Sequence, residues 1–381
     1  MAFDGSSVQN AIYIGGADWP ITPEEWEQRA ETVLEPEAFG YIAGGAGAEL
    51  TMRANREAFE RRRLRPRMLA GNRERDLSVE VLGTRSAAPF LLAPIGVLSI
   101  AHAEGEVACA RAAAAARVPF ILSSAASSSI EEIAEAMGDA PRWFQLYWIN
   151  DRDVAASFVD RAAKAGFGAI VLTLDTLILG WRPRDLARAY LPFLSGQGCA
   201  QYFTDPTFCK RLEKPPAEDV LTAAATMLMT FPNLGLTWED LEWLRSRVEL
   251  PLLVKGVLTG EDAVRARDCG VDGIIVSNHG GRQVDGAVAA LDAYVEVREA
   301  LGGEATVLVD GGVRTGADVL KAMALGADAV LVGRPYAYGL AAGGQAGVEA
   351  VIRQLLAETD ITLALLGGRS VRDLDPTYLA P

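Results

Sequence analysis

The chain has 381 residues, of which 50% are hydrophobic, and a formal net charge of −14 at pH 7. Its length suits one large domain or two ordinary ones, and its apolar content excludes a disordered chain. The acidic balance excludes nucleic acid or an anionic membrane surface as the main partner, because binding to phosphates needs a basic face. The charge otherwise serves solubility.

Cysteine usage and the ends of the chain point to a cytoplasmic protein. The four cysteines form no CxxC pair and no spacing typical of metal ligands, so we expect no metal site and a reducing compartment. The first residues lack the basic and apolar regions of a signal peptide, and no uncharged apolar run is long enough to cross a membrane.

Residues 1–85 are predicted to form a helical extension, with an amphipathic helix over 21–34 that begins near Thr22. We expect this extension to cover the bottom or side of the domain that follows. Eight short apolar runs come next, at 90–96, 119–124, 143–147, 169–175, 252–256, 273–278, 306–312 and 329–334. They are continuous rather than alternating, which is typical of strands covered on both faces.

Helical patterns separate these runs, over 104–118, 129–138, 152–166, 260–270, 291–303 and 315–328. The second is predicted to start from Ser128, with Glu131 completing a capping box. Strands that alternate with helices indicate a (β/α)8 TIM barrel over 86–370, followed by a tail over 371–381. The alternative, an open doubly wound sheet, would carry a GxGxxG turn after its first strand, and this sequence has none there.

One connection is longer than the others. The fourth run ends at Asp175 and the fifth begins at Leu252, which leaves an insertion over about 183–236. Long insertions in compact barrels are usually functional lids or mobile segments, and one that follows a strand lies on the C-terminal face, where barrel active sites are found.

Polar residues follow every predicted strand, so they should converge on one rim of the barrel. His279 follows the sixth strand and precedes two glycines, and Asp175 could orient its ring and support its protonated form. Lys255 ends the fifth strand, where it either pairs with a carboxylate such as Asp310 or stabilises anionic charge on a cofactor.

The last two strands are followed by glycines and an arginine just before a helix. Asp310, Gly311, Gly312 and Arg314 follow the seventh strand, and Gly333 and Arg334 follow the eighth. Loops at these two positions commonly bind phosphate in this fold, because glycine lets the backbone approach and arginine neutralises the charge. The alternative is an ordinary pair of strand-to-helix turns.

Taken together, these stretches resemble the FMN-dependent α-hydroxy acid oxidase and dehydrogenase family, which includes glycolate oxidase and lactate oxidase. The similar motifs are YIAGGAGAE, APIGV, FQLYW, LTLDT, LLVKG, SNHGGRQ, DGGVRTGADV and VGRPYAYG, within about 22–370. In the insertion, RPRDLARAYLPFLSG and QYFTDPTF are closest in wording to lactate 2-monooxygenase.

The resemblance implies FMN as the cofactor and a set of residues that hold it. Backbone groups of Pro94, Ile95 and Gly96 would face the flavin, and Ser123, Gln145, Thr173 and Ser277 would lie along the ring. Lys255 would stabilise the anionic reduced flavin. Asp310, Gly311, Gly312, Arg314, Gly333 and Arg334 would hold the ribityl chain and phosphate.

The resemblance also implies how substrate is bound and oxidised. Arg182 and Arg282 would bind the carboxylate, assisted by Tyr41 and Tyr147, and Tyr202 in the insertion would contact substrate. His279 would accept the hydroxyl proton and Asp175 would stabilise the resulting cation. Ala125 stands where glycolate oxidases carry tryptophan, which widens the pocket unless Trp148 or Trp181 fills it.

The implied reaction is oxidation of a small, lactate-like L-2-hydroxy acid to the 2-oxo acid, with O2 as electron acceptor. Either hydrogen peroxide is released, as in an oxidase, or the oxo acid is decarboxylated in the site, as in lactate 2-monooxygenase. A larger acid such as mandelate is an alternative substrate. A phosphate-binding barrel isomerase without flavin and a flavin-bearing sensor are alternative functions. We expect a homo-oligomer, a tetramer or an octamer.

Overall fold

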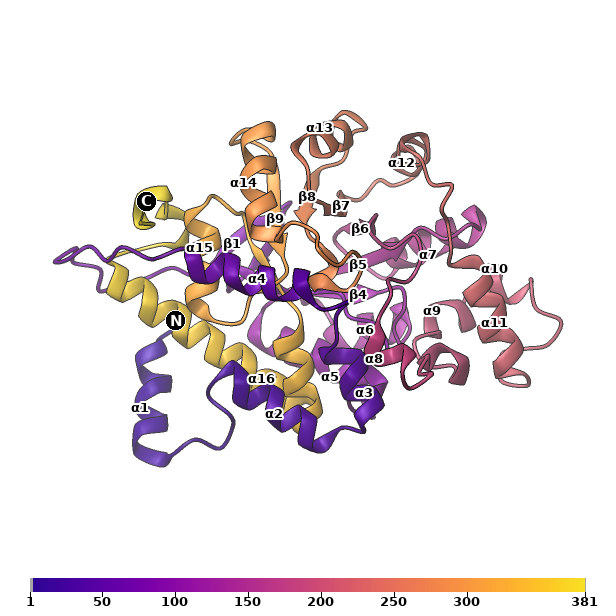
Figure 1. The fold of residues 1–381 in the computed structure, drawn as a ribbon, viewed down its shortest axis with the longest axis horizontal. Coiled ribbons are helices and arrows are strands. Elements are labelled where there is room, and N and C mark those ends of the chain that lie inside the picture. Colours follow the sequence, from indigo (N-terminus) through magenta and orange to yellow (C-terminus); the bar gives the residue numbers. More distant parts are fainter. Residues whose placement is uncertain (1–2, 381) are drawn as a thin grey trace.

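The computed structural model describes residues 3–380, and its centre is a closed barrel of eight parallel strands in the order β10-β3-β4-β5-β6-β7-β8-β9 (Figure 1). The strands are β3 Phe90–Leu92, β4 Phe120–Ser123, β5 Arg142–Tyr147, β6 Ile170–Thr173, β7 Leu252–Val257, β8 Gly273–Val276, β9 Thr306–Asp310 and β10 Val330–Val332. Each lies within or overlaps a predicted apolar run. The TIM barrel is therefore confirmed, and the open sheet is excluded.

Helices surround the barrel and cover the outer faces of its strands, which explains why the strands are apolar throughout. They are α5 Gly105–Ala116, α6 Ile130–Met137, α7 Arg152–Lys164, α12 Trp238–Arg245, α13 Gly260–Asp268, α14 Ala290–Leu301, α15 Gly316–Ala324 and α16 Arg334–Leu366. Helix α16 is the longest and is interrupted by non-helical backbone at Gly343 and Gly344, where His102 packs against the chain.

The capping box of α6 lies one residue later than predicted. Ser129 caps the helix and Glu132 completes the box, rather than Ser128 and Glu131. Ser128 is instead drawn into contacts with other elements, because its hydroxyl donates to Glu106 and its carbonyl accepts from Gln201. Tertiary contacts thus decided between two adjacent serines.

The N-terminal extension contains α1 Gly5–Gly15, α2 Pro23–Val33, α3 Pro36–Ala43 and α4 Leu50–Arg61, followed by a hairpin of β1 Val79–Val81 and β2 Thr84–Ser86. Thr22 caps α2, as predicted. The expectation that this extension covers the bottom or side of the barrel is only half right. The hairpin lies at the N-terminal ends of the strands, where Thr84 accepts a hydrogen bond from Trp143. Helices α3 and α4 instead reach the opposite end, beside the loop at His279–Gly281.

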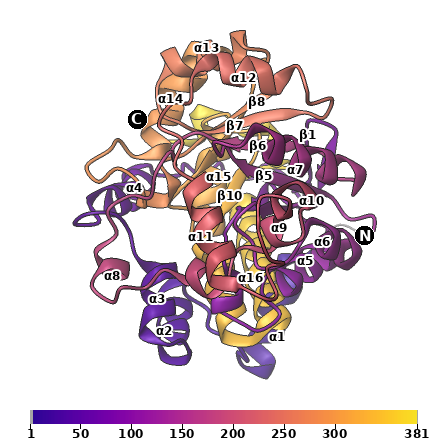
Figure 2. The ribbon, with the colours of Figure 1, turned by 90° about the vertical axis from the view of Figure 1, so that its right-hand side faces the viewer.

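The insertion carries α8 Pro183–Leu186, α9 Ala200–Phe203, α10 Pro206–Cys209 and α11 Val220–Thr230, which lie in front of the barrel in Figure 2. Fully buried polar residues fasten its middle to the barrel. Gln201 donates to the carbonyl of Ser128 and accepts from the amide of Ile130, and Asp205 accepts from Ser157 and Arg161. Residues 199–209 are therefore an anchored wall rather than a free flap.

None of the helices within residues 3–380 combines the length and the apolar character that crossing a membrane requires.

Candidate active site

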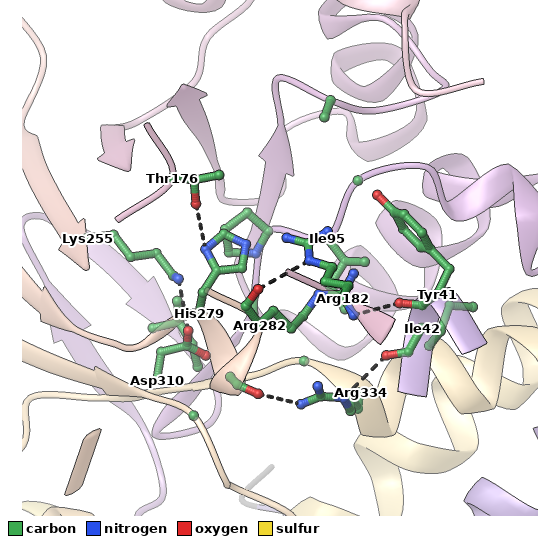
Figure 3. A pocket seen from close by; sticks show the side chains of 18 of the residues that line it. Tyr41, Ile42, Ile95, Thr176, Arg182, Lys255, His279, Arg282, Asp310 and Arg334 are labelled. Carbon is green, nitrogen blue, oxygen red and sulfur yellow. Dashed lines mark hydrogen bonds and ion pairs between the residues drawn. The ribbon is translucent and has the colours of Figure 1, made fainter. Parts of the chain in front are cut away.

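A cavity opens at the C-terminal end of the barrel, where loops from almost every strand meet (Figure 3). The predicted site residues that line it are Tyr41, Pro94, Ile95, Gly96, Tyr147, Arg182, Lys255, His279, Arg282, Asp310, Gly311, Gly312, Arg314, Gly333 and Arg334.

His279 lies in the turn that follows β8, with a left-handed backbone (φ 58°) that a non-glycine residue rarely adopts. Its Nδ1 is 2.9 Å from Oδ1 of Asp175, and its Nε2 is 3.4 Å from the hydroxyl of Tyr147. A carboxylate can only accept, so Nδ1 carries the proton and Nε2 of the neutral ring is free to act as a base. Burial lowers the pKa of His279 and outweighs the attraction of Asp175, so the ring is neutral at pH 7.

Asp175 approaches His279 because of an irregularity in β7. The pairing of β7 with β8 shifts between Lys255 and Val257, and the intervening Gly256 has φ 104°. A Cβ on Gly256 would lie 2.7 Å from Cβ of Asp175, so only glycine fits. Burial alone would raise the pKa of Asp175, but His279 and Lys255 attract its negative charge and hold the pKa below its ordinary value.

Arg182 and Arg282 face the same cavity, and no carboxylate in residues 3–380 lies within 4 Å of either guanidinium. Arg282 donates to the carbonyls of Tyr41 and Gly44, and Arg182 donates to the carbonyl of Arg282 and to Gln283. Burial and the nearby Arg182 lower the pKa of Arg282 to about 9, which leaves it charged at neutral pH. Asp185 attracts both arginines but lies farther than 4 Å from each. Two cations at a cavity wall with no carboxylate in direct contact form a site for an anionic ligand.

Lys255 lies on the other side of His279 and is 4% exposed. Its Nζ is 3.0 Å from Oδ2 of Asp310 and 2.9 Å from the hydroxyl of Ser277. Burial alone would lower the pKa of Lys255, but Asp310 and Asp175 outweigh that effect and raise it. The pairing with Asp310 that the sequence suggested is therefore present, and it keeps a positive charge beside the cavity.

The opposite end of the cavity has the chemistry of a phosphate site. Gly311 and Gly312 have φ 110° and 91°, and a Cβ on Gly312 would lie 2.7 Å from the carbonyl oxygen of Asn55. Arg314 and Arg334 border these glycines and donate only to backbone carbonyls within residues 3–380. Burial and the proximity of Arg334 lower the pKa of Arg314 to about 10, so a phosphate group would relieve the repulsion between them.

Three predicted cofactor residues are buried just below the cavity and are not on its lining. Ser123 donates to Oε1 of Gln145 at 2.9 Å, and Nε2 of Gln145 donates to Thr173 at 3.0 Å. They form a polar chain across the ends of β4, β5 and β6. Ser277 is also buried and donates to Asp310.

Three aromatic residues do not lie where the sequence suggested. Tyr202 is 2% exposed and packs edge-on against Phe158 of α7 and Phe208 of the insertion, so it does not line the cavity. Trp148 packs against Trp243, and Trp181 is 72% exposed. Neither tryptophan lines the cavity, whereas Ala125 and Phe193 do.

The apolar wall of the cavity instead comes from residues that sequence reasoning missed: Leu179, Phe193 and Phe231. Phe231 packs edge-on against Tyr147, with ring centroids 5.3 Å apart. Two asparagines hold the segment around Phe231 in place. Asn150 donates to the carbonyls of Met229 and Pro232, and Asn233 donates to that of Trp148.

Other missed residues hold the loops together. Gln283 lies in the SNHGGRQ motif and accepts from Arg182 while donating to the carbonyls of Asp175 and Ile178. Thr176 contacts both Asp175 and His279. Its position directly after Asp175 was the one signal that could have identified it.

Comparisons with known proteins agree with this geometry. The profile of the FMN-dependent dehydrogenase family matches residues 30–381. The L-lactate oxidase of Nostoc sp. is 45% identical over 94% of this chain and 98% of its own length. The FMN-dependent alpha-hydroxy acid dehydrogenase qulF of Penicillium citrinum is 44% identical over 96% and 94%. The crystal structure of mandelate oxidase with (S)-4-hydroxymandelic acid superposes with a TM-score of 0.84 at 40% identity, covering 95% of this chain and 98% of that one.

These similarities also decide between the functions that the sequence left open. The uncompensated arginines and close-packed glycines suit FMN, and the family match makes FMN the cofactor, so the isomerase without flavin is excluded. The chain belongs to the FMN-dependent α-hydroxy acid oxidase and dehydrogenase family and is an enzyme that oxidises 2-hydroxy acids.

Proposed function

We propose that the protein oxidises L-2-hydroxy acids with a small apolar side chain, such as lactate, to the 2-oxo acid and uses O2 as the electron acceptor. One observation carries the proposal: the free Nε2 of His279 faces the same cavity as two arginines that have no carboxylate partner. This arrangement offers a base and an anion site to one small molecule.

Each residue has a distinct task in this proposal. Arg182 and Arg282 bind the substrate carboxylate, and the hydroxyls of Tyr41 and Tyr147 hydrogen-bond its oxygens. Nε2 of His279 accepts the proton of the substrate hydroxyl, and Asp175 stabilises the imidazolium that forms. FMN, when bound, would supply the oxidant and take up the two electrons and the hydrogen of the substrate Cα–H bond.

Further residues would hold that cofactor. We assign the backbone of Pro94, Ile95 and Gly96 and the polar chain of Ser123, Gln145 and Thr173 to the flavin ring. Lys255, held by Ser277 and Asp310, would place positive charge beside the flavin and would stabilise negative charge on it. The ribityl chain and phosphate are assigned to the glycines and arginines that follow β9 and β10: Asp310, Gly311, Gly312, Arg314, Gly333 and Arg334.

The apolar wall supports a hydrophobic substituent on the substrate, and it supports mandelate as a second candidate. Ala125, Leu179, Phe193 and Phe231 offer no charged or hydrogen-bonding side chain, so they favour a methyl or aryl group over a polar one. Lactate needs little of this space, whereas mandelate would use the aromatic surface of Phe193 and Phe231.

The central experiment is anaerobic reduction of the purified, FMN-loaded enzyme by both enantiomers of chiral 2-hydroxy acids, including lactate and mandelate. We expect L-lactate to bleach the flavin, and His279→Ala to retain FMN but bleach about 10²–10⁴-fold more slowly. His102→Ala is the matched control, since His102 packs against α16 outside the cavity. Bleaching by no hydroxy acid would indicate the flavin-bearing sensor and contradict the proposal.

Product analysis in air separates the two outcomes of lactate oxidation. Pyruvate with hydrogen peroxide identifies an oxidase, and acetate with carbon dioxide identifies a lactate 2-monooxygenase. The outcome depends on whether the oxo acid leaves before the flavin is reoxidised. The tetrameric or octameric assembly and the cytoplasmic setting stay predictions, and light scattering tests the first.

A further inference from the structure

We propose that Thr176 is a positioning residue for the base: its hydroxyl donates to Asp175 and thereby limits how strongly this carboxylate holds His279. The inference rests on the proposed role of His279 and adds the group that adjusts its basicity.

Three polar side chains form a closed triangle at the end of β6. Oγ1 of Thr176 is 2.8 Å from Oδ1 of Asp175 and 3.1 Å from Nδ1 of His279, and the third side, between Nδ1 and Oδ1, measures 2.9 Å. Thr176 is 6% exposed, so bulk water does not compete strongly for these bonds. Figure 3 shows the threonine hydroxyl directed at the imidazole.

The hydroxyl has one hydrogen, and the geometry gives it to the carboxylate. Nδ1 of His279 carries its own proton and cannot accept another hydrogen bond at that atom, so the hydroxyl donates to the charged Oδ1 of Asp175 at 2.8 Å. Oδ1 of Asp175 therefore serves two donors, Thr176 and His279. Oδ2 is buried and finds no hydrogen-bond partner within residues 3–380, so both donors share the same oxygen.

The other groups around His279 make this sharing consequential. The charged and titratable groups that face it are Asp175 after β6, Tyr147 on β5, Lys255 on β7 with Asp310 behind it, and Arg182 before α8. Lys255 and Arg182 disfavour a protonated imidazole, and Asp175 is the one of them, within residues 3–380, that contacts the ring and favours it. A change in the hydrogen bonds that Asp175 accepts therefore acts directly on His279.

The chain has only two histidines, which permits a direct test. The FMN-loaded oxidised enzyme, labelled with ¹³C at the histidine ring, gives one NMR signal for each histidine, and a His102→Gln variant assigns them. Thr176→Val removes one of the two donors to Asp175, so the carboxylate interacts more strongly with His279 and favours the imidazolium. We therefore expect the midpoint of the His279 titration to rise by about half to one pH unit. Thr176→Ser keeps the hydroxyl and should titrate like the parent, and His102 serves as the internal control in every sample.

The pH profile of flavin reduction by L-lactate gives a second readout. In Thr176→Val its acidic limb should move to higher pH together with the NMR titration, and in Thr176→Ser it should stay where it is in the parent. An unchanged His279 titration in Thr176→Val, or an equal shift in both variants, overturns the inference. If Thr176→Val does not take up FMN, Thr176→Ala removes the hydroxyl without adding a methyl group and is judged by the same criterion. The NMR titration needs no turnover, so a failure of every hydroxy acid to reduce the flavin would contradict the proposed function while leaving this result readable.

Discussion

Asn55 and Asn278 exchange two amide hydrogen bonds of 2.8 Å each, which join α4 of the N-terminal extension to the residue directly before His279. Both side chains are almost fully buried. Their oxygens accept further bonds from the amides of Ala290 and Gly281. The extension thus contributes to the position of the proposed base, although it lies outside the barrel in sequence.

Asn55→Ala should destabilise the protein, because it removes both bonds and leaves Asn278 buried without its partner. We expect a loss of about 2–4 kcal/mol in the free energy of unfolding, measured from urea denaturation. Asn10→Ala, on the exposed face of α1, should change it by less than about 0.5 kcal/mol. A double-mutant cycle with Asn278→Ala should give a coupling between the two sites; purely additive losses would show that the pair does not act together.

The rate of flavin reduction should fall at acidic pH. His279 must be neutral to accept a proton, and burial sets its pKa below the ordinary value of 6.5. The rate is therefore expected to be constant from pH 6.5 up to the approach of the pKa of about 9 of Arg282, and to decline on the acid side as the pH drops through the lowered pKa of His279. In Asp175→Asn the attraction that favours the imidazolium is lost, so the acidic limb should move to still lower pH while the plateau rate decreases. Stopped-flow reduction between pH 5 and 9 measures the position of the acidic limb and the plateau rate. An acidic limb that moves to higher pH in Asp175→Asn would show that Asp175 does not favour the imidazolium.

The phosphate assignment predicts a selective loss of cofactor affinity. Arg314→Gln removes a cation that lines the cavity, so FMN binding to the apoprotein should weaken by about 10–100-fold, as expected for a charge-assisted bond. Riboflavin has no phosphate, and its affinity should be unchanged. Flavin fluorescence titration measures both, with Arg353→Gln on the exposed side of α16 as the control. Equal losses for the two flavins would place the phosphate elsewhere.

Gly256→Ala tests the bulge beside Asp175. The new Cβ must push Asp175 away, so flavin reduction should slow by at least about tenfold, beyond a strain cost of about 1–3 kcal/mol in stability. Gly302→Ala is a matched control, because Gly302 also has positive φ (75°) but no atom near the added Cβ. It should lose stability and keep its rate of reduction. Similar rates in both variants would mean that the close contact with Asp175 has no role.

Phe231→Ala should change which acid is preferred. Removing the ring takes away aromatic surface that mandelate would contact, so the affinity for mandelate should fall about 3–10-fold while that for lactate changes little. Leu234→Ala, at an exposed site of the same segment, is the control. The ratio of the two dissociation constants, from anaerobic titration of the flavin spectrum, is the measure. An unchanged ratio would place the substituent against another wall.

The barrel could be predicted from sequence because each buried parallel strand is a continuous apolar run, and the rim residues could be found because each follows such a run directly. His279, Asp175 and Lys255 are close in space for this reason alone. Which serine caps α6 depended on tertiary contacts, and so did the position of the half of the extension that reaches the active site. Local sequence patterns do not encode such contacts.

The residues that were missed share a physical reason. Asn55 and Asn278 are 223 positions apart, and nothing in the neighbourhood of Asn55 distinguishes it from a surface residue of an amphipathic helix. Phe193 and Phe231 belong to an insertion without a repeating pattern. The middle of that insertion is fixed by Gln201 and Asp205, whose buried bonds join residues distant in sequence, and Phe193 lines the cavity.

The insertion separates the residues proposed for the reaction from those proposed to contact the substrate's substituent. The proposed residues for electron transfer and proton removal come from many strand ends, whereas much of the apolar wall comes from one contiguous segment between Leu179 and Phe231. In such an enzyme, substitutions within one segment can change substrate specificity without altering the reaction residues, provided that Gln201 and Asp205 still anchor that segment to the barrel.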